Sequence, residues 1–254
     1  MTATSTARVD GRSGLQADNP GTASPVTFIT GTTSGIGAAL VAHYLERGHR
    51  VVGLARREAV VQHERYRHLQ ADVTDEVALR AAFAEVRRGY GRLDHLINNA
   101  GTASMNHAML TTARSVERLL KVNVQGTFLA AREAAKVMQR QHFGRIVNFT
   151  TVAVPLALDG EAAYVASKAA VEGLTRVLAR EFAPFGVTVN AVGPTPVKTA
   201  LIAGVPDAAI AALVGRQAIT RLGTMADVAN VVDFFLSPES GFVTGQVLYL
   251  GGVS

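Results

Sequence analysis

Short, continuously apolar segments alternate with longer segments of helical periodicity along most of this chain. The apolar segments, each expected to form a strand, are Val26–Thr30, Val51–Ala55, Leu93–Asn98, Ile146–Thr150, Val187–Val192 and Val247–Leu250. Helices are expected from Ile36 to Leu45 and over Glu76–Arg88, Ala113–Gln139, Glu161–Phe182 and Ala226–Leu236. Strands without polar alternation are covered on both faces, which is typical of a parallel sheet. The alternation therefore predicts an α/β fold: a doubly wound parallel sheet with helices on both faces.

Length and composition fit a single domain. The chain has 254 residues, of which 48% are hydrophobic, and this is enough for one large α/β core. Residues 1–24 are rich in Ser, Thr, Gly and Ala, so we expect a disordered N-terminal tail before a domain over residues 25–254. Residues 195–220 are Ala-rich and show no strand pattern, which predicts a helical flap near the site.

Composition also excludes several classes of function. The chain has no cysteine, which excludes disulfides, thiolate catalysis and cysteine-ligated zinc, and the isolated His107 and His142 predict no metal site. The formal net charge is +5, but the basic residues are scattered, so we expect no nucleic-acid partner. No apolar run approaches the ~20 residues that span a bilayer. We therefore expect no membrane partner and a cytoplasmic location.

A glycine-rich segment, Thr30–Gly37, lies where the first strand leads into the first helix. Gly31 permits a tight turn, Gly35 lets the backbone approach a pyrophosphate, and Gly37 lets helix and strand pack closely. Free N–H groups at the helix N-terminus then face the phosphates. A structural turn alone would also explain three glycines, but this placement favours a dinucleotide site.

The end of the second strand indicates which dinucleotide is bound. An acidic residue there would bind the ribose hydroxyls of NAD and repel a 2′-phosphate. This chain has Ala55 followed by Arg56 and Arg57, which favours NADP(H) over NAD(H). A solvated turn is the alternative interpretation of the two arginines. Asp72 and Val73, at the end of the next strand, are expected over the adenine.

Tyr164 and Lys168 lie four residues apart on an expected helix and therefore share a face. A phenol with a pKa of ~10 is a poor acid or base at neutral pH. A nearby ammonium stabilises the phenolate and lowers that pKa, so the pair predicts general acid–base catalysis. The spacing alone is common on surface helices.

Taken together, the motifs resemble those of the short-chain dehydrogenase/reductase family. They are Thr30–Gly37, Asn98-Asn99-Ala100-Gly101, Asn123, Tyr164 with Lys168, and Pro194 with Thr199, in the family's order and spacing. The resemblance extends from about Val26 to Gly252. It implies a single Rossmann-like domain with about seven parallel strands and a dinucleotide across their carboxyl ends.

The resemblance also implies roles for individual residues. Tyr164 is similar to the catalytic acid or base, Lys168 to the residue that lowers its pKa and binds the ribose, and Asn123 to the residue that holds a water of the proton relay. Thr151 stands where most members have a serine. The implied cofactor-binding residues are Gly31, Thr33, Ser34, Gly35, Ile36, Gly37, Arg56, Arg57, Asp72, Val73, Asn99, Ala100, Gly101, Tyr164, Lys168, Pro194, Val197 and Thr199.

Three departures from the family pattern bear on function. The Thr151 hydroxyl can replace the serine hydroxyl, although its methyl group narrows the pocket. Pro194-Thr195 replaces Pro-Gly, so the backbone has less freedom there. Leu250-Gly251-Gly252 replaces Asp-Gly-Gly, which removes a contact of the terminal turn.

Loop lengths resemble those of the 3-oxoacyl-carrier-protein reductases most closely. Two positions at which those enzymes would carry carrier-binding arginines are His142 and Phe185 here, and Arg140 and Arg145 could substitute for them. The hypothesis of an acyl-carrier partner is therefore weakened but stays open. Residues expected to line the substrate pocket are mostly apolar, which favours an apolar or acyl-chain ketone.

The combined hypothesis is an NADPH-dependent carbonyl reductase acting on a small molecule, with a 3-oxoacyl thioester as one possible substrate. The alternatives are an NAD-dependent alcohol dehydrogenase of the same family and a catalytically silent nucleotide-binding sensor. Members of this family commonly pack two such long helices, here expected over Ala113–Gln139 and Glu161–Phe182, across a two-fold axis. The resemblance therefore implies a homotetramer, with a dimer as the alternative.

Overall fold

The computed structural model describes residues 24–198 and 204–253. Of the tail expected over residues 1–24, only Ser24 lies within these ranges. Thr199, Leu201 and Ile202 of the expected flap lie outside them. Seven strands form one parallel sheet in the order β3-β2-β1-β4-β5-β6-β7. Their bounds are β1 Val26–Thr30, β2 Arg50–Ala55, β3 Tyr66–Gln70, β4 His95–Asn98, β5 Gly144–Phe149, β6 Val187–Gly193 and β7 Val247–Tyr249. The doubly wound α/β fold expected from the sequence is confirmed.

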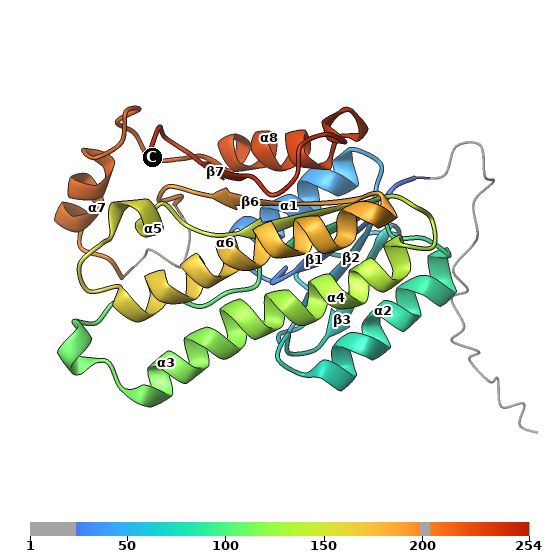
Figure 1. The fold of residues 1–254 in the computed structure, drawn as a ribbon, viewed down its shortest axis with the longest axis horizontal. Coiled ribbons are helices and arrows are strands. Elements are labelled where there is room, and N and C mark those ends of the chain that lie inside the picture. The colour runs from blue at the N-terminus through green and yellow to red at the C-terminus, as the bar shows by residue number, and fades with distance from the viewer. Residues whose placement is uncertain (1–23, 199–203, 254) are drawn as a thin grey trace, which may run out of the picture.

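Helices cover both faces of the sheet (Figure 1). Helices α2 (Glu76–Tyr90), α4 (Gly126–Met138) and α6 (Ala162–Phe182) pack on one face, and α1 (Gly35–Glu46) and α8 (Met225–Leu236) pack on the other. The remaining helical segments are α3 Ala113–Leu119, α5 Ala153–Leu156, α7 Asp207–Val214, and the short or irregular turns Ala108–Leu110, Leu120–Gln125, Ala183–Phe185 and Pro238–Ser240.

Successive residues of each central strand enter opposite cores. On β1, Phe28 joins the core beneath α2, α4 and α6, whereas Ile29 joins the core beneath α1 and α8. Both side chains are 0% exposed. The same division separates Leu96 from Ile97 on β4. Burial on both faces is why these strands read as uninterrupted apolar runs.

Strand β3 is absent from the apolar runs expected from the sequence. Its residues are Tyr-Arg-His-Leu-Gln, and two of them, Arg67 and Gln70, are exposed. It lies at the edge of the sheet and pairs only with β2 among the described strands. An edge strand with a solvated face has no continuous apolar signal.

The helix expected over Ala113–Gln139 is interrupted. A π-helical segment, Leu120–Gln125, separates α3 from α4, and the buried side chain of Asn123 lies within it. Single π-helical turns inside α-helices often occur at functional sites, because they shift the direction of a side chain without ending the helix.

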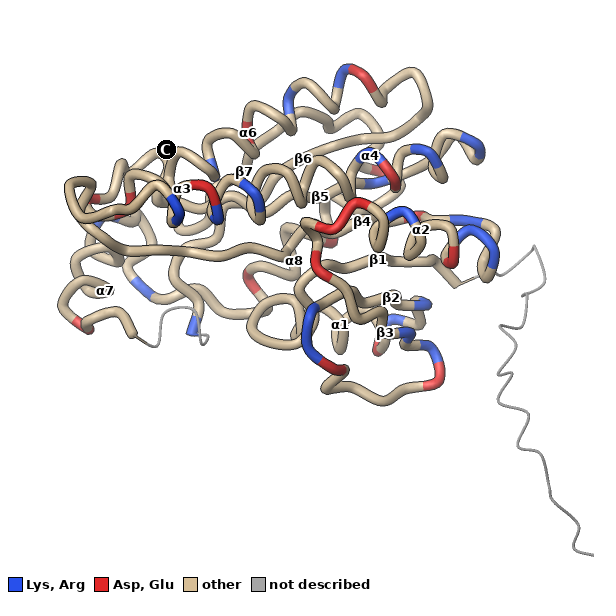
Figure 2. The backbone as a smooth tube through the Cα atoms, turned by 90° about the horizontal axis from the view of Figure 1, so that it is seen from below, with Lys and Arg blue, Asp and Glu red and all other residues tan. Residues whose placement is uncertain are grey.

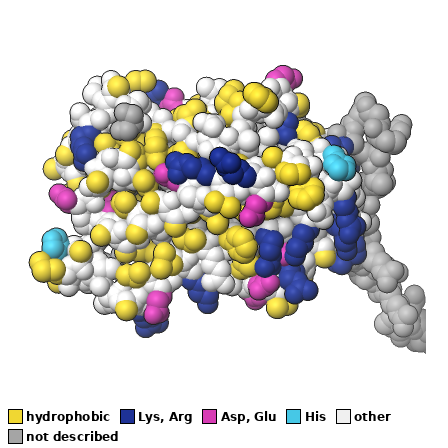
Figure 3. All heavy atoms as spheres, viewed as in Figure 1, with side chains coloured by type: hydrophobic (Ala, Val, Ile, Leu, Met, Phe, Trp, Pro, Cys, Tyr) yellow, Lys and Arg dark blue, Asp and Glu magenta, His cyan; other side chains and the backbone are white. Residues whose placement is uncertain are grey.

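Basic and acidic residues are interspersed along the helices and do not form separate stretches of one sign. Lys and Arg alternate with Asp and Glu on α2, α3 and α4 (Figure 2). On the face seen in Figure 3, basic side chains are nonetheless prominent near α2 and α4, where a groove is lined by Arg80, Arg87, Lys136 and Arg140. No helix in the described ranges is both long and apolar enough to cross a membrane.

A buried carboxylate joins three elements beside the carboxyl edge of the sheet. Glu172 on α6 is 5% exposed, and its Oε1 accepts hydrogen bonds of 2.7 Å from the Thr150 hydroxyl and from the Tyr249 phenol. The Tyr249 ring packs so closely on Gly193 that a Cβ there would lie 2.4 Å from Cδ1 of the ring. Glu172 thus connects α6 to the end of β5 and to β7, and Tyr249 extends the connection to β6.

We predict that Tyr249→Phe lowers the free energy of unfolding by about 1 to 3 kcal/mol, because it removes a hydrogen bond to a carboxylate and keeps the ring. Urea denaturation would measure the change. Thr150→Ser, which retains the second hydroxyl donor, serves as the control and should change stability less. An unchanged midpoint for Tyr249→Phe would show that this connection contributes nothing to folding.

Candidate active site

A pocket of about 480 Å³ opens at the carboxyl ends of the central strands. Its walls come from the ends of β5 and β6, the start of α6, the loop after β4, and α7. The strand order reverses between β1 and β4. From β1 the chain adds β2 and β3 on one side, and β4 to β7 then follow on the other side. Ligands of open α/β sheets bind in the crevice at such a switch point.

The glycine-rich loop has the backbone geometry that the sequence predicts. Gly31 has φ of +76° and Gly35 has φ of +57°, both in the left-handed region. A Cβ on Gly37 would lie 2.2 Å from the Gly31 carbonyl oxygen, so α1 can approach the loop only with glycine at that position. The Asn99 amide donates to the carbonyl oxygens of Thr30 and Gly31 at 3.0 and 3.1 Å and holds the loop against β4.

Arg57 reaches from the end of β2 to the glycine-rich loop. Its Nε donates to the Thr33 hydroxyl at 3.3 Å, and its terminal nitrogen donates to the Ser34 hydroxyl at 3.0 Å. The turn that carries it is held from β3, because the Gln70 amide donates to the Arg56 carbonyl at 2.9 Å. Arg57 is therefore more than a solvated turn residue, since it places a guanidinium beside the start of α1.

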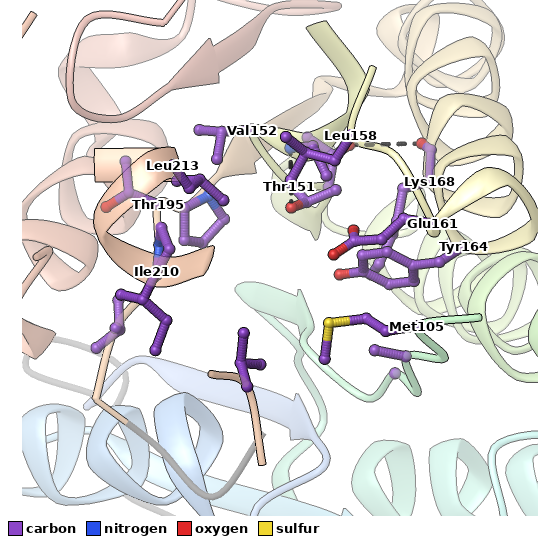
Figure 4. A pocket seen from close by; sticks show the side chains of 18 of the residues that line it. Met105, Thr151, Val152, Leu158, Glu161, Tyr164, Lys168, Thr195, Ile210 and Leu213 are labelled. Carbon is purple, nitrogen blue, oxygen red and sulfur yellow. Dashed lines mark hydrogen bonds between the residues drawn. The ribbon is translucent and has the colours of Figure 1, made fainter. Parts of the chain in front are cut away.

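Tyr164 and Lys168 lie on one face of α6 and line the pocket (Figure 4). The Lys168 ammonium is buried and donates to the Phe149 carbonyl at 2.8 Å. Burial lowers the pKa of Lys168 to about 8. Burial also raises the pKa of Tyr164 to about 12, a hydrogen bond with Thr151 opposes that rise, and the Glu161 carboxylate adds to it. The lower Tyr164 pKa expected from the sequence is thus not what this structure gives, because desolvation by burial dominates the shift.

Asn123 links the π-helical segment to α6 and to the loop after β4. Its side chain accepts from the Thr102 N–H at 2.8 Å and donates to the Thr102 carbonyl and to the Ser167 hydroxyl, both at 2.9 Å. A Cβ on Gly101 would lie 3.3 Å from Asn123 Oδ1 and 3.4 Å from Lys168 Nζ. The absence of a side chain at Gly101 therefore leaves space beside both polar groups.

Thr151 follows directly after β5 and Thr150, and its hydroxyl accepts from the Ala153 N–H at 3.2 Å. In Figure 4 the Thr151 hydroxyl and the Tyr164 phenol face the same space. Pro194 and Val197 line the opposite wall of the pocket. The Thr195 side chain is 5% exposed, and Val197 forms an isolated bridge with Gly223 that holds this loop.

The structure brings only part of the predicted set into this pocket. Lining it are Ile36, Asn99, Gly101, Thr151, Tyr164, Lys168, Pro194 and Val197. Elsewhere along the same edge of the sheet, or just behind the wall, lie Gly31, Thr33, Ser34, Gly35, Gly37, Arg56, Arg57, Asp72, Val73, Ala100 and Asn123. Asp72 accepts from the Thr74 N–H at 2.8 Å, and Val73 packs on Gly126 at the start of α4.

Three charged groups of the pocket were not singled out from the sequence. Asp159, Glu161 and Arg216 all line it, although its walls were expected to be mostly apolar. The Arg216 guanidinium donates to the Leu156 carbonyl at 2.7 Å. Glu161 was treated as the start of a helix, and its distance of three residues from Tyr164 was the signal that could have placed it in the site.

Two residues that bear on carrier docking lie at the opposite edge of the sheet. His142 and Phe185 occupy neighbouring turns there, since a Cβ on Gly186 would lie 2.2 Å from the His142 carbonyl oxygen. Arg145 was expected as a substitute, and this expectation is wrong. Its side chain is 4% exposed, donates to the carbonyls of Gly144, Ser237 and Pro238, and stacks on the Phe143 ring. Arg140 is exposed.

The altered C-terminus is held by backbone contacts. The Leu250 N–H donates to the Gly193 carbonyl at 2.9 Å, and the Gly251 carbonyl accepts from the Ile219 N–H at 3.0 Å. The Leu250-Gly251-Gly252 sequence therefore still packs against the loop that follows β6, without an acidic side chain.

Comparisons with known proteins agree with this arrangement. A family model described as enoyl-(acyl carrier protein) reductase matches residues 31–253. The 3-oxoacyl-(acyl-carrier-protein) reductase FabG of Staphylococcus aureus is 32% identical, with 89% of this chain and 96% of that protein covered. The FabG of Escherichia coli is 29% identical over the same shares of the two chains.

Solved structures show the same fold. The aldohexose dehydrogenase of Thermoplasma acidophilum superposes with a TM-score of 0.82 at 30% identity, covering 91% of this chain and 94% of its own. ElxO with NADP bound gives a TM-score of 0.82 at 29% identity, covering 90% and 97%. The chain therefore belongs to the short-chain dehydrogenase/reductase family and is an NAD(P)-dependent oxidoreductase that acts on carbonyl and hydroxyl groups.

Proposed function

We propose that this enzyme is an NADPH-dependent carbonyl reductase that converts a ketone to a secondary alcohol. The observation that supports this most strongly is the convergence of the Thr151 hydroxyl, the Tyr164 phenol and the Lys168 ammonium on one pocket at the switch point of the sheet. Retention of both Tyr164 and Lys168 argues against a silent nucleotide sensor, because such a protein needs neither.

The pocket residues divide the proton chemistry between them. The Thr151 hydroxyl and the Tyr164 phenol hydrogen-bond the substrate carbonyl oxygen. A reduced nicotinamide, when bound at this edge of the sheet, would supply the hydride for the carbonyl carbon. As negative charge develops on that oxygen, the Tyr164 O–H bond breaks and its proton forms the alcohol. A phenol with a pKa of about 12 holds its proton throughout the physiological range, so it acts as an acid and not as a pre-formed base.

Lys168 and Asn123 return the proton to Tyr164. The ammonium stabilises the tyrosinate that remains after proton transfer, and the buried Asn123 side chain near it holds the loop after β4 and α6 in place around the ammonium. Both groups are fixed by hydrogen bonds to backbone atoms, which keeps them in place during turnover.

The edge of the sheet fits a dinucleotide with a 2′-phosphate. The left-handed glycines and the N-terminus of α1 offer N–H groups to the pyrophosphate. Ala55 leaves the end of β2 without an acid, and Arg57 lies beside Thr33 and Ser34. The relative ElxO, solved with NADP bound, supports the same choice. An NAD-dependent alcohol dehydrogenase is the second candidate, and the position of Arg57 disfavours it.

The substrate is proposed to be a ketone with an apolar skeleton. Met105, Leu158, Ile210 and Leu213 form apolar walls. FabG relatives support a 3-oxoacyl thioester as one possibility, whereas the burial of Arg145 leaves few basic groups near His142 and Phe185 for an acidic carrier. We also propose a cytoplasmic location and a homotetramer. Leu120 in the π-helical segment, Phe128 on α4 and Val177 on α6 expose apolar side chains that contacts between subunits would bury. Hydrophobic side chains are visible across the face shown in Figure 3.

Tyr164→Phe should lower kcat for ketone reduction by about 10²- to 10⁴-fold, because it removes the acid and keeps the ring. Binding of NADPH, followed by fluorescence titration, should stay within about threefold of the wild type. Full activity in this variant would overturn the assignment. NADPH binding without turnover of any carbonyl by the wild-type protein would instead favour the sensor.

Arg57→Ala should lower kcat/KM for NADPH by about 10- to 100-fold and leave kcat/KM for NADH nearly unchanged. Only NADPH carries the 2′-phosphate that the Arg57 guanidinium is proposed to bind. Arg67→Ala on the neighbouring strand, which removes an exposed arginine paired with Glu85, is the matched control. A wild-type preference for NADH would contradict the proposed cofactor.

A further inference from the structure

Glu161 places a carboxylate in the pocket beside the reacting group. It precedes the first residue of α6 and lies three residues before Tyr164. In Figure 4 its carboxylate points into the pocket, on the same side as the Tyr164 phenol and the Thr151 hydroxyl. The Glu161 carboxylate raises the pKa of Tyr164, which agrees with this proximity.

Among the described residues, no contact of this carboxylate stabilises the fold. It does not cap α6, since no backbone N–H of the helix donates to its side chain. Within residues 24–198 and 204–253, neither a side-chain hydrogen bond nor a charged partner contributes to the pKa of its carboxylate. Burial alone shifts its pKa upward, without an opposing contribution from a basic group.

The basic groups of the same pocket are engaged elsewhere. The Lys168 ammonium donates to the Phe149 carbonyl, and the Arg216 guanidinium donates to the Leu156 carbonyl. The other charged group of the lining is Asp159, which is also acidic. Both basic groups keep their charge, but neither forms an ion pair with Glu161 among the described residues, so its carboxylate faces the pocket without a direct partner.

A half-buried carboxylate is costly unless a partner compensates its charge. A hydroxyl would donate a hydrogen bond to the carboxylate and leave its charge in place, whereas a cation would compensate the charge itself. An ammonium carried on an apolar skeleton also matches the apolar walls opposite Glu161.

We infer that Glu161 binds a cationic nitrogen of the substrate, so that the preferred substrates are amino ketones with the amine a few bonds from the carbonyl. This inference rests on the proposed function, because the carbonyl oxygen is taken to lie at Tyr164 and Thr151. It names a substrate class that a neutral acyl thioester does not belong to.

Two ketones of the same shape test the inference. In 1,1-dimethyl-4-oxopiperidinium a quaternary nitrogen replaces the quaternary carbon of 4,4-dimethylcyclohexanone. With saturating NADPH, the wild-type kcat/KM should be at least about tenfold higher for the cation, and Glu161→Gln should remove this preference while leaving the neutral ketone within about threefold. Glu181→Gln, the same change at an exposed position near the end of α6, should keep the preference.

Three results would overturn the inference. The first is an equal wild-type kcat/KM for the two ketones, and the second is an equal loss of both in Glu161→Gln, which would assign the residue to proton transfer. The third is 4-hydroxycyclohexanone matching the cation, which would show that a hydrogen-bond donor suffices without charge.

Failure of the proposed function can be told apart from failure of this inference. Calorimetric binding of 1,1-dimethyl-4-oxopiperidinium needs no turnover, and the inference expects about tenfold weaker binding to Glu161→Gln than to the wild type. Weaker binding without reduction of any ketone would refute the reductase and keep the cation site. Equal binding to the two proteins would refute the cation site, whatever the reductase activity.

Discussion

The contact between α6 and the end of β5 positions Thr151, Tyr164 and Lys168, three of the proposed catalytic residues. Lys168 Nζ donates to the Phe149 carbonyl, Glu172 one turn later accepts from Thr150, and Thr151 follows. Tyr164 lies one turn before Lys168 on the same face. The three functional side chains therefore depend on a single helix-to-strand register, which Tyr249 supports from β7.

Burial at this contact shifts the pKa values of Tyr164 and Lys168 in opposite directions. Desolvation raises the pKa of Tyr164 and lowers that of Lys168, which is the expected response of an acid and a base in an apolar environment. In the proposed reductase the protonated phenol would act as the proton donor, and the lysine, with a pKa of about 8, titrates close to the physiological range. Glu161 adds negative charge at the phenol, and a cationic substrate would neutralise that charge on binding.

Much of this could be predicted from the sequence, and the omissions have physical reasons. Two-sided burial made the central strands visible as apolar runs, whereas the solvated edge strand β3 gave no such signal. Local spacing revealed Tyr164 with Lys168, but the π-helical turn around Asn123 depends on packing against α6 that spacing does not encode. Glu172 and Tyr249 are 77 residues apart and meet only through the register of β7, and the direction of the Tyr164 pKa followed from burial, which the sequence does not give.

The central claim is that a protonated Tyr164 donates the proton while a charged Lys168 stabilises the tyrosinate. The pH dependence of kcat/KM for ketone reduction, measured with saturating NADPH from about pH 6 to about pH 10, tests it most directly. Lys168 is charged below its pKa of about 8, so kcat/KM should be constant at low pH and fall about tenfold per pH unit above about pH 8. A profile that stays level to about pH 10 would contradict the account, because the reaction would then not need the charge on Lys168.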